Sequence, residues 1–283
     1  MTINNLTSLI IGKPLATAFL IFSALIHTSA HANTIALETL PYAQISDGTA
    51  INIAGRQRML SERMVKAYIQ LSIDVDTEKA NVQLQGAIQL FQEQLQQLTR
   101  YAPNSNISDN LKTVQQQWNK VEQIVQEQPE IKKIPELILL GEELVARSHQ
   151  VVLDIQYFSG SSSALLVNTS GRQRMLSQRM AKYYFAHLAG QRQSTTVNRF
   201  ETSLAEFEQG LASLMKAPEN SLEITQALKK VEAQLKFSKS GFKQLSSGNY
   251  APHVISRTTE SMLKRMDKIT QQYAALHDQL KSS

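Results

Sequence analysis

The chain has 283 residues, of which 42% are hydrophobic and 19% charged, so it can form a packed core and is not a disordered protein. Its net charge of +5 is spread along the sequence, without the basic patch or tail of a nucleic-acid-binding protein. The absence of cysteine excludes disulfides, thiolate metal sites and cysteine nucleophiles, and the low numbers of glycine (11) and proline (7) favour a helical protein over a β-sandwich.

The first 32 residues have the pattern of an export signal. An apolar run at residues 15–26 follows Lys13, and a small-x-small cleavage motif ends at Ala32. This run is short for a bilayer span, which takes about 20 residues. We therefore predict that residues 1–32 are a cleaved signal peptide and that the mature protein is periplasmic. The alternative is an uncleaved anchor in the inner membrane, formed by residues 9–26.

The rest of the chain is predicted to be all-α, with eight helices in two similar sets of four. Prolines fall at matching places in both sets, after the second helix and at the start of the fourth. Short connections favour two tandem up-down four-helix bundles, at residues 33–159 and 160–283. Since no proline occurs between Glu136 and Ala217, the fourth helix could also run into the fifth as one long or kinked helix. In chain order, the helices are expected at residues 44–73, 77–101, 108–128, 135–159, 162–190, 194–217, 221–246 and 252–280.

One polar segment is duplicated. Residues 51–66 and 167–182 are identical at 11 of 16 positions at an offset of 116, whereas residues 74–100 share only three identities in 27 with their counterparts. Those three positions form one apolar helical stripe. A hydrophobic core needs only apolar periodicity, so the retention of Gly-Arg-Gln-Arg-Met-Leu-Ser in both copies favours a function for these two boxes.

On a helical projection of the first box, Ile53, Leu60 and Met64 form the core stripe and Arg58 points the opposite way, among other aliphatic residues. This pattern predicts that a second helix packs on the arginine side, leaving a partly desolvated guanidinium that requires an anionic partner. Glu62, one turn further on, is a candidate for that partner.

The boxes, residues 52–63 and 168–179, resemble the conserved segment of the PilJ/NarX-type sensor domain, an extracytoplasmic four-helix module of nitrate/nitrite sensor kinases and of type IV pilus chemotaxis transducers. In the nitrate sensors, the arginine three residues after the glycine reaches the anion from two dimer-related helices. The resemblance therefore implies a binding site made by the following residues of the two boxes: Arg58 and Arg174 at that position, with Arg63, Arg179, Arg56, Arg172, Gly55, Gly171, Asn52 and Asn168 around them.

The resemblance implies a non-catalytic sensor that binds a small anion, with nitrate or nitrite as first candidates, and signals by contact with a membrane sensor or chemotransducer. A guanidinium fork offers a planar anion coplanar donors. The kinase form of the motif has a lysine where this chain has Ile53 and Thr169, which leaves the identity of the anion open. No cofactor, metal site, enzyme motif or nucleic-acid partner is predicted.

Two questions stay open at the level of sequence. The boxes could face each other within one chain, or the bundles could stack end to end, in which case each box would need a partner chain in a homodimer. Alternatively, the protein is a helical envelope interaction module in which the boxes dock another protein and bind no small ligand.

Overall fold

The computed structural model describes residues 45–243 and 252–282, and in this part of the chain all regular structure is helical. The predicted signal and anchor segments lie outside the described residues. Within the described residues, no helix combines the length and the apolarity that crossing a membrane requires. The helices are α1 (Asp47–Ser72), α2 (Thr77–Tyr101), α3 (Ser105–Val125), α4 (Ile134–Ser159), α5 (Ser163–Leu188), α6 (Ser194–Met215), α7 (Leu222–Lys243) and α8 (Pro252–Ser282), with a 3₁₀ turn at Ile131–Lys133.

Local sequence signals explain where several helices begin. The Ser46 hydroxyl caps α1 by accepting a bond from the amide of Thr49, and the Asn104 side chain caps α3 through the amide of Ile107. Proline occupies the first turn of α4 and the first position of α8, where the missing amide proton costs no helical hydrogen bond. The all-α prediction is confirmed, and the predicted helix ends lie within about three residues of the observed ones.

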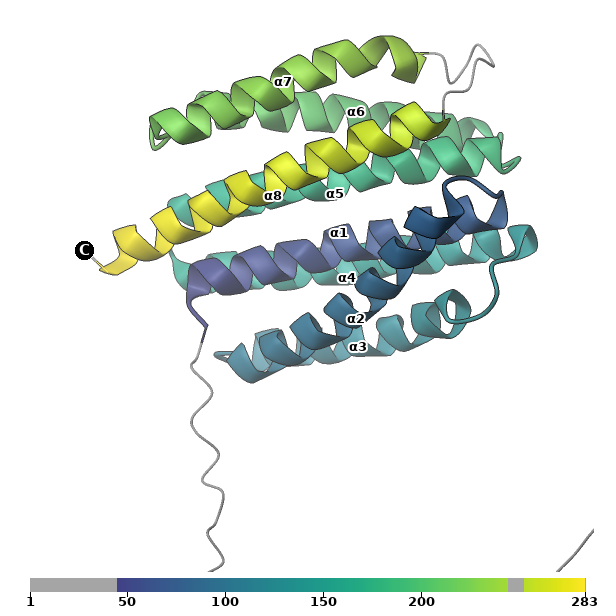
Figure 1. Cartoon of the computed structure of the whole chain (residues 1–283). Coiled ribbons are helices and arrows are strands. Elements are labelled where there is room, and N and C mark those ends of the chain that lie inside the picture. The colour runs from purple at the N-terminus through teal and green to yellow at the C-terminus, as the bar shows by residue number, and fades with distance from the viewer. Residues whose placement is uncertain (1–44, 244–251, 283) are drawn as a thin grey trace, which may run out of the picture. The chain divides into compact units, whose positions relative to one another are not determined.

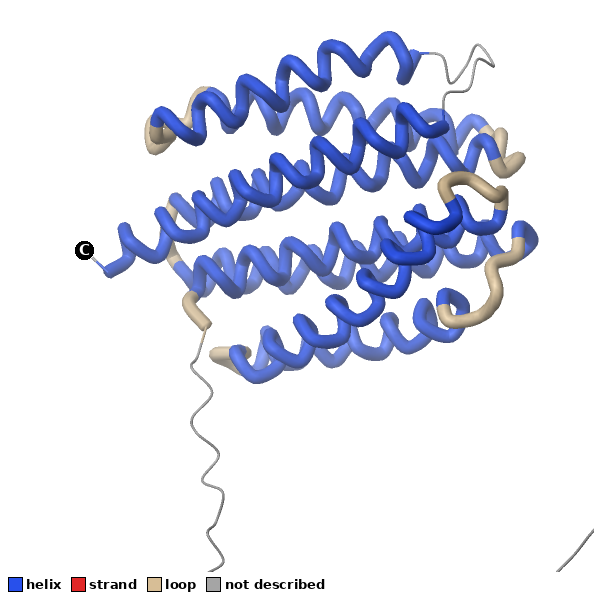
Figure 2. The backbone as a smooth tube through the Cα atoms, viewed as in Figure 1, coloured by secondary structure: helices blue, strands red, loops and turns tan. Residues whose placement is uncertain are grey.

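The helices form two up-down four-helix bundles, α1–α4 and α5–α8 (Figure 2). In each bundle the first helix packs against the second and fourth, and the third packs against the fourth. The two bundles are not separate bodies, however, because residues 43–283 make one compact unit. The most extensive helix contact in that unit joins α1 of one bundle to α5 of the other, and α8 also contacts α1.

The alternative prediction, in which the fourth and fifth helices form one long helix, is wrong. Helix α4 ends at Ser159, Gly160 adopts a left-handed conformation (φ 67°), and α5 starts at Ser163. The turn reverses the chain, so α5 runs back beside α1 in the same direction (Figure 1). His277 of α8 fixes this turn, since its ring nitrogens contact the hydroxyls of Ser159 (3.2 Å) and Ser163 (2.8 Å).

Because they lie at the centre of this arrangement, α1 and α5 are buried almost all round. The apolar stripe of α1 faces its own bundle, and the opposite side faces α5, as the position of Arg58 among aliphatic residues predicts. The same holds for α5. Polar residues of both boxes are therefore buried, including Gln57, Arg58, Gln173 and Arg174.

Candidate functional site

The two glycines of the boxes bring the two halves of the site together. A Cβ atom added to Gly55 would lie 3.9 Å from the Cα atom of Gly171, and the reverse distance is the same. The backbones of α1 and α5 thus approach closely at matching positions. The boxes face each other within one chain, and end-to-end stacking with a site that needs a second chain is not what the structure shows.

Arg58 and Arg174 converge on this glycine contact. The same Cβ position on Gly55 lies 3.3 Å from Nη2 of Arg58 and 3.4 Å from Nη2 of Arg174, so the two guanidiniums are neighbours. Their exposed fractions are 1% and 0%. Helical side chains lean toward the N-terminus, which lets each arginine cross to the other helix. Arg58 Nη2 donates to the Asn168 carbonyl (3.3 Å) and Arg174 Nη2 donates to the Asn52 carbonyl (3.0 Å).

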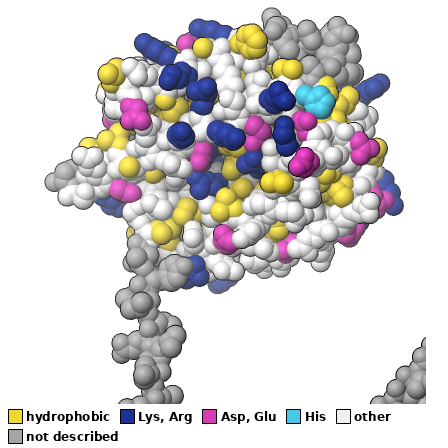
Figure 3. Space-filling model, viewed as in Figure 1, with side chains coloured by type: hydrophobic (Ala, Val, Ile, Leu, Met, Phe, Trp, Pro, Cys, Tyr) yellow, Lys and Arg dark blue, Asp and Glu magenta, His cyan; other side chains and the backbone are white. Residues whose placement is uncertain are grey.

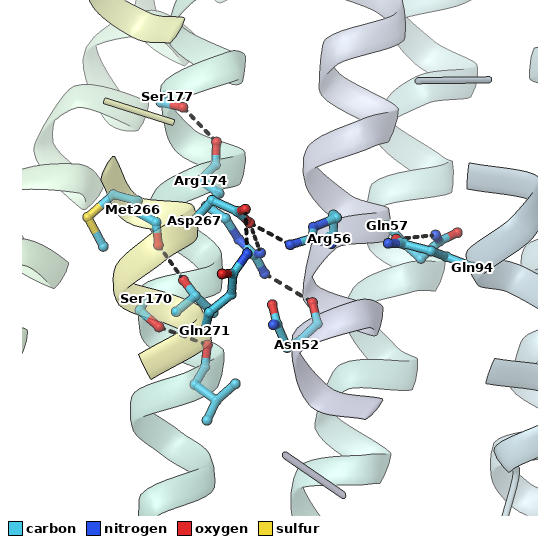
Figure 4. Close-up of polar contacts among 12 residues, drawn as sticks. Asn52, Arg56, Gln57, Gln94, Ser170, Arg174, Ser177, Met266, Asp267 and Gln271 are labelled. Carbon is cyan, nitrogen blue, oxygen red and sulfur yellow. Dashed lines mark hydrogen bonds and ion pairs between the residues drawn. The ribbon is translucent and has the colours of Figure 1, made fainter. Parts of the chain in front are cut away.

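The fourth helix of each bundle supplies a different second partner. Nη1 of Arg174 donates to Oδ1 of Asp267 on α8 (2.5 Å; Figure 4), whereas Nη1 of Arg58 lies 2.9 Å from Nδ1 of His149 on α4. Burial and the neighbouring Arg174 lower the pKa of Arg58 to about 9, and burial, partly offset by Asp267, lowers that of Arg174 to about 10. Both guanidiniums stay protonated at neutral pH.

His149 brings no negative charge to Arg58. Burial and the cationic Arg58 lower the pKa of His149 to about 4, so the ring is neutral at pH 7 and Nδ1 accepts the proton of Arg58 Nη1. Within the described residues, Arg58 forms no ion pair, and the Nε atoms of both Arg58 and Arg174 are buried without a hydrogen-bond partner. A buried cation without a counter-ion is costly unless an anion joins it.

The other predicted arginines surround the central pair and are held by carboxylates. Arg56 binds Asp267 (2.7 Å) on one side of the molecule, and Arg172 binds Glu206 (3.0 Å) on the other. Further along the helices, Arg63 binds Glu260 (2.6 Å) and Arg179 binds Glu62 (2.6 Å). All four side chains reach the surface in part, and we assign them to the contacts between helices.

The two predicted asparagines contribute mainly through their backbone. Their carbonyl groups receive the crossing arginines, while the side chain of Asn168 donates to Gln156 (2.6 Å). The side-chain oxygen of Asn52 is buried and has no hydrogen-bond partner. The structure thus brings Asn52, Asn168, the two glycines and the two central arginines together, and leaves the outer arginines to ion pairs.

The expectation that Glu62 pairs with Arg58 is wrong. Glu62 is 1% exposed and turns to α5, where it binds Arg179 and also Lys182 (2.8 Å). Burial opposes its ionisation, but the two cations together hold the pKa of Glu62 below its usual value. Lys66 of α1, which matches Lys182, binds Glu260 of α8 (2.8 Å). These pairs cross from one bundle to the other.

Sequence reasoning predicted the fourth helices but missed the residues that they bring to the site, His149, Asp267 and Glu260. A signal for them was present: at an offset of 118 rather than 116, residues 142–159 align with residues 260–277, with Glu142 matching Glu260 and His149 matching Asp267. The buried positions of the two segments also coincide. An insertion of two residues between the second box and α8 hides this correspondence from a search at the offset of the boxes.

A groove of about 760 Å³ opens beside the site, between α1, α2 and α8. Its walls include apolar Met59, Leu60 and Leu263, and Figure 3 shows Lys and Arg side chains gathered on this face of the molecule. Asp267 and Arg56 line the groove, and Arg174 lies behind them (Figure 4). Solvent therefore reaches the carboxylate that holds Arg174.

The chain is thus an all-α protein of two four-helix bundles, joined through their first helices and with a buried arginine pair at the junction. The family model for the type IV pili methyl-accepting chemotaxis transducer N-terminal domain (PilJ) matches residues 43–134 and 156–236, more than half of the chain, and the chain belongs to this family. The family consists of non-catalytic sensor domains at the input end of chemotransducers, and the match confirms the resemblance of the two boxes and the two tandem copies.

No curated protein and no solved structure matches the chain significantly. The two matched regions contain both boxes, whereas His149 and Asp267 lie outside them. The partners that the fourth helices give the central arginines thus lie outside the matched segments.

Proposed function

We propose that residues 43–283 form a periplasmic, non-catalytic sensor that binds a small monovalent anion at the arginine pair and reports its presence by contact with a membrane signalling partner. The observation that carries this proposal is the pair of adjacent, fully buried guanidiniums of which only Arg174 has a carboxylate. Nitrate and nitrite are the first candidates, because the guanidinium fork suits small planar oxyanions.

The position of Arg58 explains how a bound anion would alter the packing of the two bundles. This one side chain starts on α1, contacts His149 on α4 and donates to a carbonyl of α5, so it links three helices and both bundles. An anion that accepts a hydrogen bond from the unpaired Nε–H of Arg58 adds a negative charge at the contact between the bundles. Packed helices respond to such changes by small rigid shifts, which a partner can detect.

A docking function for the central arginines has less support. Arg58 and Arg174 are buried inside the chain and are out of reach of another protein in this conformation. The boxes do make a contact between helices, but this contact is between the two boxes of the same chain. The same arrangement builds within one chain the two-fold site that dimerisation provides in the nitrate sensors, so no homodimer is required for it.

The test is thermal unfolding of residues 43–283, which form a compact unit, in nitrate, nitrite, chloride and sulfate at constant ionic strength. A ligand at about 100 times its dissociation constant adds about 2.7 kcal/mol of apparent stability. We expect nitrate or nitrite to raise Tm in the wild type and in Arg147→Gln, a control that changes an exposed arginine on α4.

The informative variant is Arg58→Gln. It removes a buried cation without a counter-ion, so we expect the ligand-free Tm to stay level or rise and the anion response to disappear. A well-folded wild type that shows no Tm shift with any of the four anions would refute the proposed function.

A further inference from the structure

The two halves of the site are built alike around the central arginines, but their fourth helices offer these arginines different side chains. Arg58 and Arg174 occupy the same position in their boxes, and each donates Nη2 to the carbonyl of the other box's asparagine, at 3.3 and 3.0 Å. Each also directs Nη1 to the fourth helix of its own bundle. The residues met there, His149 and Asp267, are equivalent positions of the repeat at an offset of 118, so the same place is filled once by a neutral ring and once by a carboxylate.

In the second half of the site, the carboxylate of Asp267 compensates the charge of Arg174 without a ligand. Asp267 accepts from Arg174 at 2.5 Å and from Arg56 at 2.7 Å through the same oxygen, which gives one anion between two guanidiniums (Figure 4). In the first half, Arg172, which matches Arg56, turns instead to Glu206 on α6. The first half therefore has no anion in the place that Asp267 takes in the second.

We propose that Asp267 is a built-in substitute for a ligand anion, so that this chain has one exchangeable anion position, at Arg58 and His149, and one that is permanently filled. The inference rests on the proposed function and specifies its ligand and stoichiometry. Because Asp267 compensates Arg174 with one negative charge, the ligand that compensates Arg58 carries one charge as well. The Nη1 atom of Arg58 is already taken by His149, so the ligand binds beside the ring at the unpaired Nε–H of Arg58. A small, planar, monovalent oxyanion suits this donor, and it binds once per chain.

This arrangement gives a two-fold sensor site with one fixed half. A site with two exchangeable anion positions could bind no anion, one anion or two anions. Here Asp267 holds one half in the anion-bound geometry at all times, and only the Arg58 half changes. His149 keeps that half available, since a neutral ring satisfies one guanidinium proton and leaves the charge uncompensated.

The test replaces His149 by the residue that stands at its equivalent position. In His149→Asp, the new carboxylate is expected to pair with Arg58, to raise the Tm of the ligand-free protein by at least about 3 °C and to weaken nitrate or nitrite binding by at least about 100-fold. The control Ala146→Asp puts a carboxylate on the exposed side of α4 and is expected to give no rise in Tm and to leave binding unchanged.

Titration calorimetry with nitrate and with nitrite supplies the second readout. We expect one anion per wild-type chain, and two in Asp267→Asn, where Arg174 loses its carboxylate. Two anions per wild-type chain, or a His149→Asp variant that binds as the wild type does, would overturn the inference and leave the proposed function standing.

If the wild type binds neither anion, the proposed function fails, and the ligand-free Tm of His149→Asp still decides whether the two positions are equivalent. A rise would show that a carboxylate compensates Arg58 as Asp267 compensates Arg174. No rise would show that it does not, and the inference would fail as well.

Discussion

Replacing Glu62 by glutamine tests whether buried ion pairs hold the two bundles together. Glu62 is 1% exposed and binds Arg179 at 2.6 Å and Lys182 at 2.8 Å, and Lys182 is fully buried. Glutamine has nearly the same shape and stands at the matching position of the other box, as Gln178. The substitution therefore removes the charge and leaves a buried ammonium with one carboxylate, Glu142, at 3.7 Å.

Breaking a buried pair costs about 3–5 kcal/mol, and the remaining contact with Glu142 places the expected loss at the lower end, about 3 kcal/mol. For a unit of this size that loss lowers Tm by about 6–12 °C. Urea unfolding followed by circular dichroism gives the free energy directly, with the m-value as a check on two-state behaviour. In the control Glu143→Gln, which breaks an exposed pair with Arg147 on α4, we expect a loss below about 0.5 kcal/mol.

The double variant Glu62→Gln/Lys182→Met removes both charges and should recover most of the stability, because apolar replacements of buried pairs are often neutral. A Glu62→Gln protein within about 1 kcal/mol of the wild type would refute the reasoning. It would mean that the junction of the bundles depends on apolar packing and that the cation is accommodated without Glu62.

Two further predictions concern packing and protonation. In Gly141→Ala the new methyl group would lie 2.6 Å from Cγ2 of Val65, so we expect the free energy of urea unfolding to fall by about 1–3 kcal/mol. In the control Gly86→Ala on α2 the methyl group meets open space, and we expect stabilisation by up to about 1 kcal/mol. Equal effects of the two substitutions would contradict the close approach of α1 and α4. Because the folded pKa of His149 is about 4, below its unfolded value, the unfolded state binds more protons between about pH 6.5 and 4, and stability should fall as pH falls through this range. This loss of unfolding free energy is at most about 3 kcal/mol, because solvent screens the half-buried ring. If the unfolding free energies of the wild type and of His149→Gln depended on pH in the same way, the prediction would be contradicted.

The fold was largely predictable because its signals are local. Apolar periodicity, proline at the first turn of α4 and α8, and short connections predict eight helices in two bundles, and residues 45–243 and 252–282 confirm them. The packing of a helix on the Arg58 side of α1 was also predictable, since an arginine among aliphatic residues on the non-core face requires a second neighbour.

The partners of the arginines were not predictable in the same way. Glu62 was expected to pair with Arg58 because the two lie one turn apart, but the tertiary structure gives it two cations from α5. Pairs within one helix can be found from spacing alone, whereas His149, Asp267 and Glu260 meet the boxes from the fourth helices, and their repeat relation is shifted by two residues.

The sequence by itself determined the helical class, the duplication and the family, because periodicity and retained residues are properties of the chain order. Only the tertiary structure decided that the chain turns back at Gly160 and that the two boxes meet within one chain. It also decided that, among the described residues, Arg174 has a carboxylate while Arg58 has none. The physical reason is that charge compensation of a buried group depends on which side chains surround it in space.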